Sequence, residues 1–105
     1  MSILSITFHV ENQTRPRWDS FLEAELPQLI DRLPNVERFI FSAVDSEMLN
    51  EGSNFNLLLI FDDERARQDF REDALDDLVS EVEKRFGQTE VMTFVTQLNR
   101  LLHRF

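Results

Sequence analysis

The feature that most constrains the fold is an apolar run near the middle of the chain. From Leu57 to Phe61 no side chain is polar, and the run is bounded by Gly52 before it and by Asp62 and Asp63 after it. A strand formed here is apolar on both faces, which is typical of a strand buried on both sides of a sheet. The fold must therefore supply something to cover each face.

Length and composition predict one soluble domain spanning residues 1–105. Of these residues 42% are hydrophobic and ten are Phe, enough for a core. The first nine residues alternate and lack a basic region, so they do not resemble a signal peptide. No apolar run approaches the roughly 18 residues that span a bilayer. We therefore expect a cytoplasmic protein with no membrane partner.

Charge and cysteine content exclude several classes of function. The chain has 11 basic and 20 acidic residues, a formal charge of −9, and no cluster of Lys or Arg. Phosphate backbones and anionic lipids are bound by such clusters, so we expect no nucleic-acid partner. The absence of Cys excludes disulfides, thiolate nucleophiles and Cys-based zinc sites.

The first half of the chain predicts a strand, a helix and a second strand. Apolar residues alternate with polar ones over residues 3–11, which indicates a strand. A helix follows, capped by Thr14 or Arg15 and ending before Pro34, with Pro27 expected to kink it because its apolar stripe keeps its phase there. Residues 36–48 predict a long second strand that joins the third through a turn at 50–54. The apolar stripe of the helix comprises Trp18, Phe21, Leu22, Leu26, Leu29, Ile30 and Leu33.

The second half predicts another helix and a fourth strand. Apolar residues recur every four positions, which indicates one helix over residues 63–86, with Gly87 as its stop and a Glu81–Arg85 ion pair near its end. Thr89 to Leu98 predict a strand. The tail, residues 98–105, is compatible with a strand extension, but its spacing favours a short helix. The four-residue repeat comprises Ala66, Phe70, Ala74, Leu78, Val82 and Phe86.

The order β-α-β-β-α-β predicts an α+β fold, the ferredoxin-like plait. Right-handed crossovers place both helices on one face of a four-stranded antiparallel sheet. The opposite face, of about 500 Å² by strand geometry, then stays apolar and uncovered. We expect two such faces to pack together in a homodimer, a dimeric α+β barrel. The alternative is a monomer whose tail folds back over its own sheet.

The element order, the length, Pro27 and the doubly apolar strand resemble the dimeric α+β barrel superfamily. That group includes antibiotic-biosynthesis-monooxygenase-like proteins and stress-responsive barrel domains. More closely, the chain resembles an uncharacterised bacterial family with this fold, and the resemblance implies the fold and the dimer but no activity. The residues that carry it are Trp18, Phe21-Leu22, Pro27, Phe70, Arg85-Phe86-Gly87 and Phe94-Val95-Thr96.

His9 is the candidate catalytic residue. It lies mid-strand on the parity opposite to the apolar residues, so together with Ser5 and Thr7 it should line the helix-free face. Histidine can serve as a base near neutral pH, and Arg15, Arg17 or Asn56 would be its neighbours in an enzyme. The simpler interpretation is a hydrogen-bonded histidine at an interface. His103, in the tail, is expected to be exposed.

The candidate ligand-binding residues are Trp18, Asn56 and Arg15, for a small molecule between sheet and helices. Trp18 also fits a core position, because it is in phase with the apolar stripe of its helix. Haem chemistry is disfavoured, because haem-degrading relatives of this fold use a His on the second long helix and residues 63–86 contain none. With two Gly residues, the chain has no phosphate-cradling loop and no dinucleotide fingerprint, so no cofactor is expected.

Acidic residues favour a solvated surface over a metal site. Hard cations need more ligands from a shaped loop than carboxylates on one helix supply, so we expect no metal. Asp45 and Glu47 at the end of the second strand similarly fit protection of a sheet edge. The acidic helix residues are Glu72, Asp73, Asp76, Asp77, Glu81 and Glu83.

Three functions therefore stay open. The leading hypothesis is a small dimeric binding or structural module. The first alternative is a cofactor-independent enzyme of the monooxygenase-like or isomerase-like kind that uses His9. The second is a protein–protein adaptor whose acidic helix face meets a basic partner, which salt would weaken.

Overall fold

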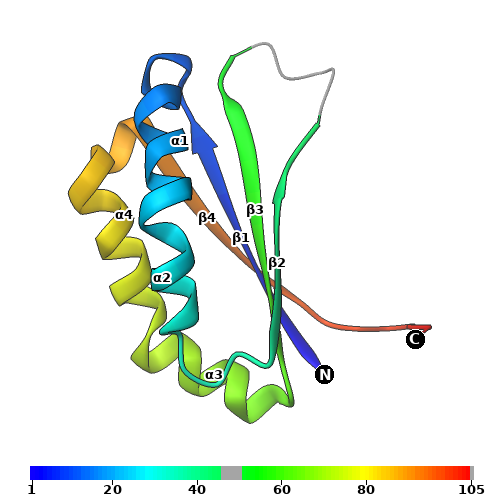
Figure 1. Ribbon diagram of the computed structural model, residues 1–105. Coiled ribbons are helices and arrows are strands. Elements are labelled where there is room, and N and C mark those ends of the chain that lie inside the picture. The colour runs from blue at the N-terminus through cyan, green and yellow to red at the C-terminus, as the bar shows by residue number, and fades with distance from the viewer. Residues whose placement is uncertain (46–50, 105) are drawn as a thin grey trace.

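The computed structural model describes residues 1–45 and 51–104 and has the predicted element order (Figure 1). The predictions for residues 46–50, which include Glu47 and the end of the second strand, and for Phe105 lie outside the described residues. The elements are β1 (Ser2–Val10), a 3-10 turn (Asn12–Thr14), α1 (Arg15–Ala24), α2 (Leu26–Asp31), β2 (Arg38–Ala43), β3 (Ser53–Phe61), α3 (Glu64–Asp73), α4 (Leu75–Glu90) and β4 (Val91–Leu98).

The four strands form one antiparallel sheet in the order β2-β3-β1-β4. β1 pairs with β3 from Ser2↔Phe61 to Val10↔Ser53, and with β4 from Val10↔Val91 to Ile3↔Leu98. Within the part of the chain that the structure describes, all the helices lie on one face of this sheet, and the other face carries none (Figure 1). The ferredoxin-like fold is confirmed.

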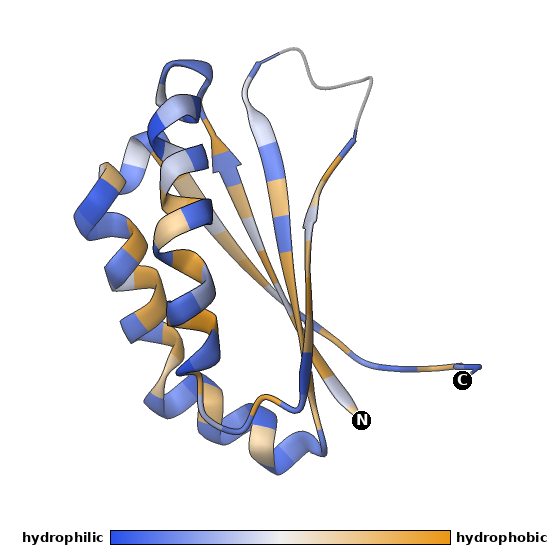
Figure 2. Cartoon of the chain, viewed as in Figure 1, coloured by the Kyte–Doolittle hydropathy of each residue, from blue (hydrophilic) through white to orange (hydrophobic). Residues whose placement is uncertain are grey.

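The core lies between the sheet and the helix layer. Every second residue of β1 and β3 points into it, and both strands alternate between buried and half-buried positions. Apolar and polar residues alternate along β1, whereas β3 is apolar without interruption from Leu57 to Phe61 (Figure 2). The largest fully buried side chains include Trp18, Phe8, Phe61 and Phe70.

The predicted kink in the first helix is confirmed, and it separates α1 from α2. Glu25 has φ −122° and ψ −42°, and Pro27 stands in the first turn of α2. Proline lacks the amide proton that would bond to Glu23, and its ring crowds that carbonyl group, so the backbone turns just before it. The buried stripe continues across the break from Phe21 to Leu26 and Ile30.

The single helix predicted over residues 63–86 is wrong, because Ala74 separates α3 from α4 with φ −128° and ψ −24°. An α-helix turns about 100° per residue, so each four-residue step of the apolar repeat moves about 40° around the axis. Over five steps the stripe would leave the core. The break at Ala74 resets its phase, and Phe70, Leu78, Val82 and Phe86 all stay buried.

Smaller differences concern the ends of elements. Gly87 interrupts α4 with φ +74°, as its predicted role as a stop requires, but one more turn follows to Glu90, so β4 begins at Val91. β2 is shorter than predicted, although Val44 N still donates to Asn54 O at 2.9 Å.

The tail is neither helix nor strand over residues 99–104, so the predicted helix is wrong for the described part. A segment of this length has too few internal hydrogen bonds to be helical without packing. Leu101 and Leu102 are 91% and 94% exposed, so the tail does not cover its own sheet. The monomer with a folded-back tail is therefore not the observed arrangement.

Candidate functional site

The helix-free face of the sheet carries a polar strip between two apolar flanks. Its inner strands, β1 and β3, place Ser5, Thr7, His9, Asn54 and Asn56 next to one another in register. The register fixes this arrangement, because successive strand residues point to opposite faces and Thr7 is directly opposite Asn56. The sequence parity of β1 therefore predicts the correct face for His9.

Side-chain hydrogen bonds join the strip into a network. Asn56 Nδ2 donates to Ser5 Oγ at 2.7 Å and to Thr7 Oγ1 at 3.2 Å. His9 Nδ1 lies 2.7 Å from Asn54 Oδ1, its direct cross-strand partner. An amide oxygen only accepts, so in this contact His9 Nδ1 is the donor. All five side chains are half-buried.

Gly52 packs directly against His9. A Cβ atom added to Gly52 would lie 2.7 Å from both His9 Nε2 and the backbone oxygen of Val10, and Gly52 has φ +75°. The Gly52 amide donates to Asn12 Oδ1 at 3.1 Å, which ties this turn to the end of β1. An open hollow of about 550 Å³ adjoins the ring. Its lining comprises His9, Glu11, Asn12, Gln13, Glu51, Gly52 and Met92.

Large apolar side chains flank the strip on the edge strands. Phe94 is 53% exposed on β4, next to Thr7, and Ile40 is 54% exposed on β2, next to Leu58. Val44, Met92 and Leu98 on the same face are also exposed. A contiguous apolar surface of this kind marks a site of interaction.

The other two predicted ligand residues, Arg15 and Trp18, lie on the opposite side of the sheet. Trp18 is fully buried, and its ring lies 5.4–5.6 Å from the rings of Phe8, Phe21, Phe55 and Phe86. Among the described residues its Nε1 has no hydrogen-bond partner. The structure thus brings His9 and Asn56 together but separates them from Trp18, which is part of the core.

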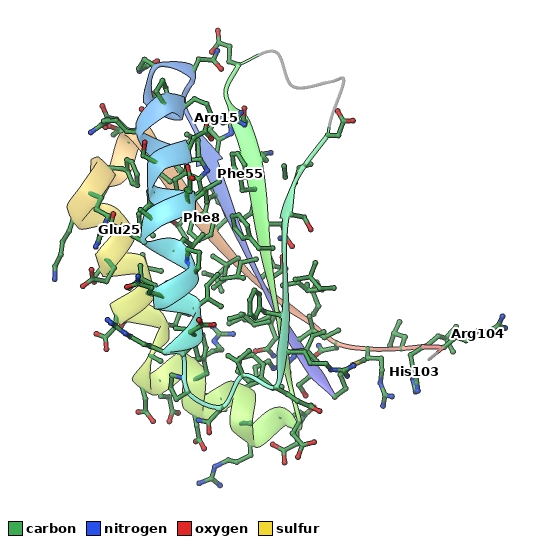
Figure 3. The ribbon with its side chains drawn as sticks, viewed as in Figure 1. Phe8, Arg15, Glu25, Phe55, His103 and Arg104 are labelled. Carbon is green, nitrogen blue, oxygen red and sulfur yellow. The ribbon has the colours of Figure 1, made fainter. Side chains whose placement is uncertain are left out.

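Arg15 lies at the start of α1, over the helix-facing side of β3 (Figure 3). Its guanidinium carbon is 5.0 Å from the ring centre of Phe55, and Nη1 donates to Ser53 Oγ at 2.9 Å. Arg17 instead pairs with Glu90 and stacks over Phe86. Neither arginine shares a face with His9. Of the three predicted neighbours of a catalytic His9, only Asn56 lies on its face, and Asn54, which was not predicted, lies there too.

An apolar groove between the helices and β2 was not predicted. It has a volume of about 330 Å³ and a nearly wholly apolar lining. It forms because α1 and α2 leave the helix-facing side of β2 uncovered at Phe39, which is 45% exposed. The sequence feature that could have predicted the groove is the pair Phe39 and Phe41, two apolar residues on the same face of one strand. The lining comprises Leu22, Leu26, Pro27, Ile30, Asp31, Phe39 and Phe41.

Arg85 links α4 to the junction between α1 and α2. It donates to both carboxylate oxygens of Glu25, at 2.9 and 3.0 Å, and to Glu81 at 2.8 Å, so the predicted Glu81–Arg85 pair is present. These hydrogen bonds lower the pKa of Glu25 and of Glu81 below the usual carboxyl value, and they raise the pKa of Arg85. Arg85 and Glu81 are half-buried and Glu25 is exposed, and the cluster joins two parts of the helix layer.

Within residues 1–45 and 51–104, no three His, Cys, Asp or Glu side chains come close enough together to hold a metal ion. In the same part of the chain, the helices are too short or too polar to cross a bilayer.

Residues 1–101 match the family model of a domain of unknown function, DUF4286. The chain belongs to this family. The predicted resemblance to an uncharacterised ferredoxin-like family is thereby confirmed, whereas the bacterial origin stays a prediction. A search of curated proteins finds no significant match.

Several solved structures share the fold of this DUF4286 chain. An EthD-family protein from Bacillus halodurans C-125 is 11% identical, with a TM-score of 0.67 over 91% of this chain and 97% of that one. A dimeric ferredoxin-like protein from an uncultured marine organism is 15% identical, with a TM-score of 0.64 over 100% and 98%. A Deinococcus radiodurans protein, provisionally named an antibiotic biosynthesis monooxygenase, is 14% identical, with a TM-score of 0.57 over 100% and 99%. At these identities the likeness shows the fold alone.

Proposed function

We propose that this chain is a homodimeric binding module, in which the helix-free faces of two copies pack together. The observation that carries the proposal is the pair of apolar flanks, with Phe94 and Ile40 more than half exposed on either side of the polar strip. Two faces of about 500 Å² bury about 1,000 Å², the lower limit of a specific interface. The dimeric ferredoxin-like protein of the same fold supports this arrangement.

The polar strip would give such an interface its register. Its side chains already bond to one another within one copy, so their burial leaves few unpaired polar atoms. A buried polar group costs little when its hydrogen bonds are made, whereas a shifted packing would bury the strip against apolar flanks. In this proposal His9 is an interface residue bonded to Asn54.

Sedimentation velocity with a charged substitution tests the dimer. One chain has a mass of 12.5 kDa, so a dimer has twice that mass. Phe94→Asp places a carboxylate on the apolar flank, and we expect the wild type to sediment as a dimer and the variant as a monomer. Gln28→Asp, on the exposed surface of α2, is the matched control and should stay dimeric. A wild type that is monomeric at all concentrations up to about 10⁻⁴ M would overturn the proposal.

The groove beside β2 is the place for a small apolar ligand between sheet and helices. Leu22→Trp should fill it and weaken binding of the probe 1-anilinonaphthalene-8-sulfonate by about fivefold, the equivalent of about 1 kcal/mol. Leu29→Trp is the control, because Leu29 lines a separate hollow between α2 and α4. Equal binding by both variants would remove the groove from the proposal. Native mass spectrometry of the purified protein would show a retained ligand directly.

A second candidate function is proton transfer by His9. The contact between Nδ1 and Asn54 Oδ1 favours it, because it holds the ring so that Nε2 can accept a proton at the edge of the open hollow. Once a turnover is known, His9→Ala should abolish it and leave the dimer intact. Dissociation of the dimer in that variant would instead support the purely structural role.

A further inference from the structure

Among the described residues, Asp31 is the only charged one that lines the apolar groove between the helices and β2. The base of the groove is apolar, because Leu26 and Ile30 are 2% and 6% exposed. Phe39, which is 45% exposed, lines it from the sheet. Asp31 itself is exposed at the end of α2, next to Ile30. The groove thus combines an apolar body with one carboxylate at its edge.

Within residues 1–45 and 51–104, Asp31 forms no ion pair. Arg32, the next residue along the chain, lines the separate hollow between α2 and α4. Arg38 alternates with Phe39 along β2, so its side chain starts from the opposite face of the sheet. The carboxylate of Asp31 is therefore available to a cation from outside the chain.

Toward the start of α1, the positive charge on the helix face that lines the groove is already paired. Arg15, Asp19 and Leu22 follow at spacings of four and three, so they share one face of α1. Arg15 Nε donates to Asp19 Oδ1 at 2.8 Å, and its Nη1 donates to Ser53 Oγ at 2.9 Å. The charges of this pair cancel, and the whole chain has a formal charge of −9. An anionic ligand therefore gains little in the groove, whereas a cationic one is attracted.

We propose that this groove binds a small organic cation, with its apolar body between the helices and β2 and a protonated amine beside Asp31. The inference rests on the groove of the proposed function and names the class of its ligand. A volume of about 330 Å³ is at the lower end of ligand pockets, about 300–1,000 Å³, so the body has one or two rings or a short chain. The groove lies on the helix-facing side of the sheet, so the proposed dimer leaves it open.

Three probes with the same apolar rings test the charge preference. They are 1-naphthylmethylamine, 1-naphthylmethanol and 1-naphthoate, which carry a positive, a neutral and a negative group at neutral pH. Titrations followed by ¹³C-methyl NMR give the Kd of each, and shifts at Leu22 and Ile30 rather than at Leu33 place the probe in the groove. At low salt we expect the amine to bind about fivefold more tightly than the alcohol, equivalent to about 1 kcal/mol for an exposed ion pair. The naphthoate should bind most weakly.

Two matched substitutions separate the site from the net charge of the chain. Asp31→Asn keeps the shape of the side chain, so it should raise the Kd of the amine about fivefold, to that of the alcohol, and leave the Kd of the alcohol unchanged. Asp77→Asn removes an exposed carboxylate from the lining of the other hollow. It should change neither Kd by more than about twofold, because salt and distance screen its charge.

Two kinds of failure are distinguishable. Equal affinity for the three probes, or an equal loss of amine binding in Asp31→Asn and Asp77→Asn, would overturn the cation preference and leave the groove standing. Probes that do not shift the methyl signals of Leu22 and Ile30, or that bind just as tightly to Leu22→Trp, would instead remove the groove from the proposed function.

Discussion

Arg67 is a buried charged residue that organises three parts of the chain. The sequence could have predicted that Arg67 is buried, because it stands three residues before Phe70 and seven before Ala74, on the buried stripe of the helix. Its partners, two backbone oxygens and Asn99, come from strand ends that only the fold brings together. Periodicity can therefore find such a residue but cannot assign its contacts.

Removing this guanidinium should destabilise the protein. Arg67→Met keeps the aliphatic part of the side chain but leaves the oxygens of Ile3, Leu98 and Asn99 without their donor, which should lower the free energy of unfolding by about 1–3 kcal/mol. Urea denaturation followed by Trp18 fluorescence measures it. Arg65→Met is the control, because its ion pair with Asp69 is exposed and should contribute less than about 1 kcal/mol. Equal losses would contradict this role for Arg67.

In the candidate site, too, the sequence predicts where a residue lies but not which residue it contacts. Alternation along β1 is enough to place His9, Ser5 and Thr7 on one face. The contact of His9 with Asn54 depends on the register of β1 and β3, because a shift of one residue would turn Asn54 to the other face. Trp18 could be placed in the core from its helix phase, and its four Phe neighbours come from four different elements, β1, α1, β3 and α4.

At the scale of elements, the backbone geometry of Gly52 and Gly87 predicts that Ala is tolerated differently at the two positions. Both have positive φ, but a Cβ added to Gly87 would have no atom of the described residues within 4 Å, whereas a Cβ added to Gly52 would lie 2.7 Å from the backbone oxygen of Val10. Gly87→Ala should cost about 1–3 kcal/mol of unfolding free energy, from backbone strain alone. Gly52→Ala should cost more, and it should shift the imidazole NMR signals of His9. Unchanged His9 signals in Gly52→Ala would contradict the close contact.

We expect the Arg85 cluster to make the stability of the helix layer depend on pH. The hydrogen bonds from Arg85 lower the pKa of Glu25 and Glu81 in the folded state, below the unfolded value of 4.5. Their stabilisation is therefore present above about pH 5 and is lost as the pH falls through the folded pKa values. The difference in unfolding free energy between wild type and Arg85→Met should thus be larger at pH 7 than at about pH 3.

A neutral contact provides the control for this pH effect. Arg71 Nη1 donates to the amide oxygen of Gln97 at 2.8 Å, and an amide does not titrate. The difference between wild type and Arg71→Met should therefore stay nearly constant over the same pH range. Denaturation curves at several pH values measure both variants, and a constant difference for Arg85→Met would show that the cluster does not stabilise the fold.

The molecule as a whole has one sheet face covered by helices and one open. If the open face forms the proposed dimer, folding is coupled to association, so the thermal midpoint should rise with protein concentration. Calorimetry over a hundredfold range of concentration should show this rise for the wild type. Phe94→Asp should remove it, and Gln28→Asp should not. A midpoint independent of concentration in the wild type would contradict a dimer that forms only from folded chains.

By itself the sequence determined the element order, the antiparallel ferredoxin-like sheet and the face on which His9 lies. These follow from local periodicity and from the handedness of crossovers, which act within one or two neighbouring elements. Tertiary structure alone decided the break at Ala74, the pairing of His9 with Asn54, the contacts of Arg67 and the outward course of the tail. Those features depend on which distant residues meet, and no pattern within a single element contains that information.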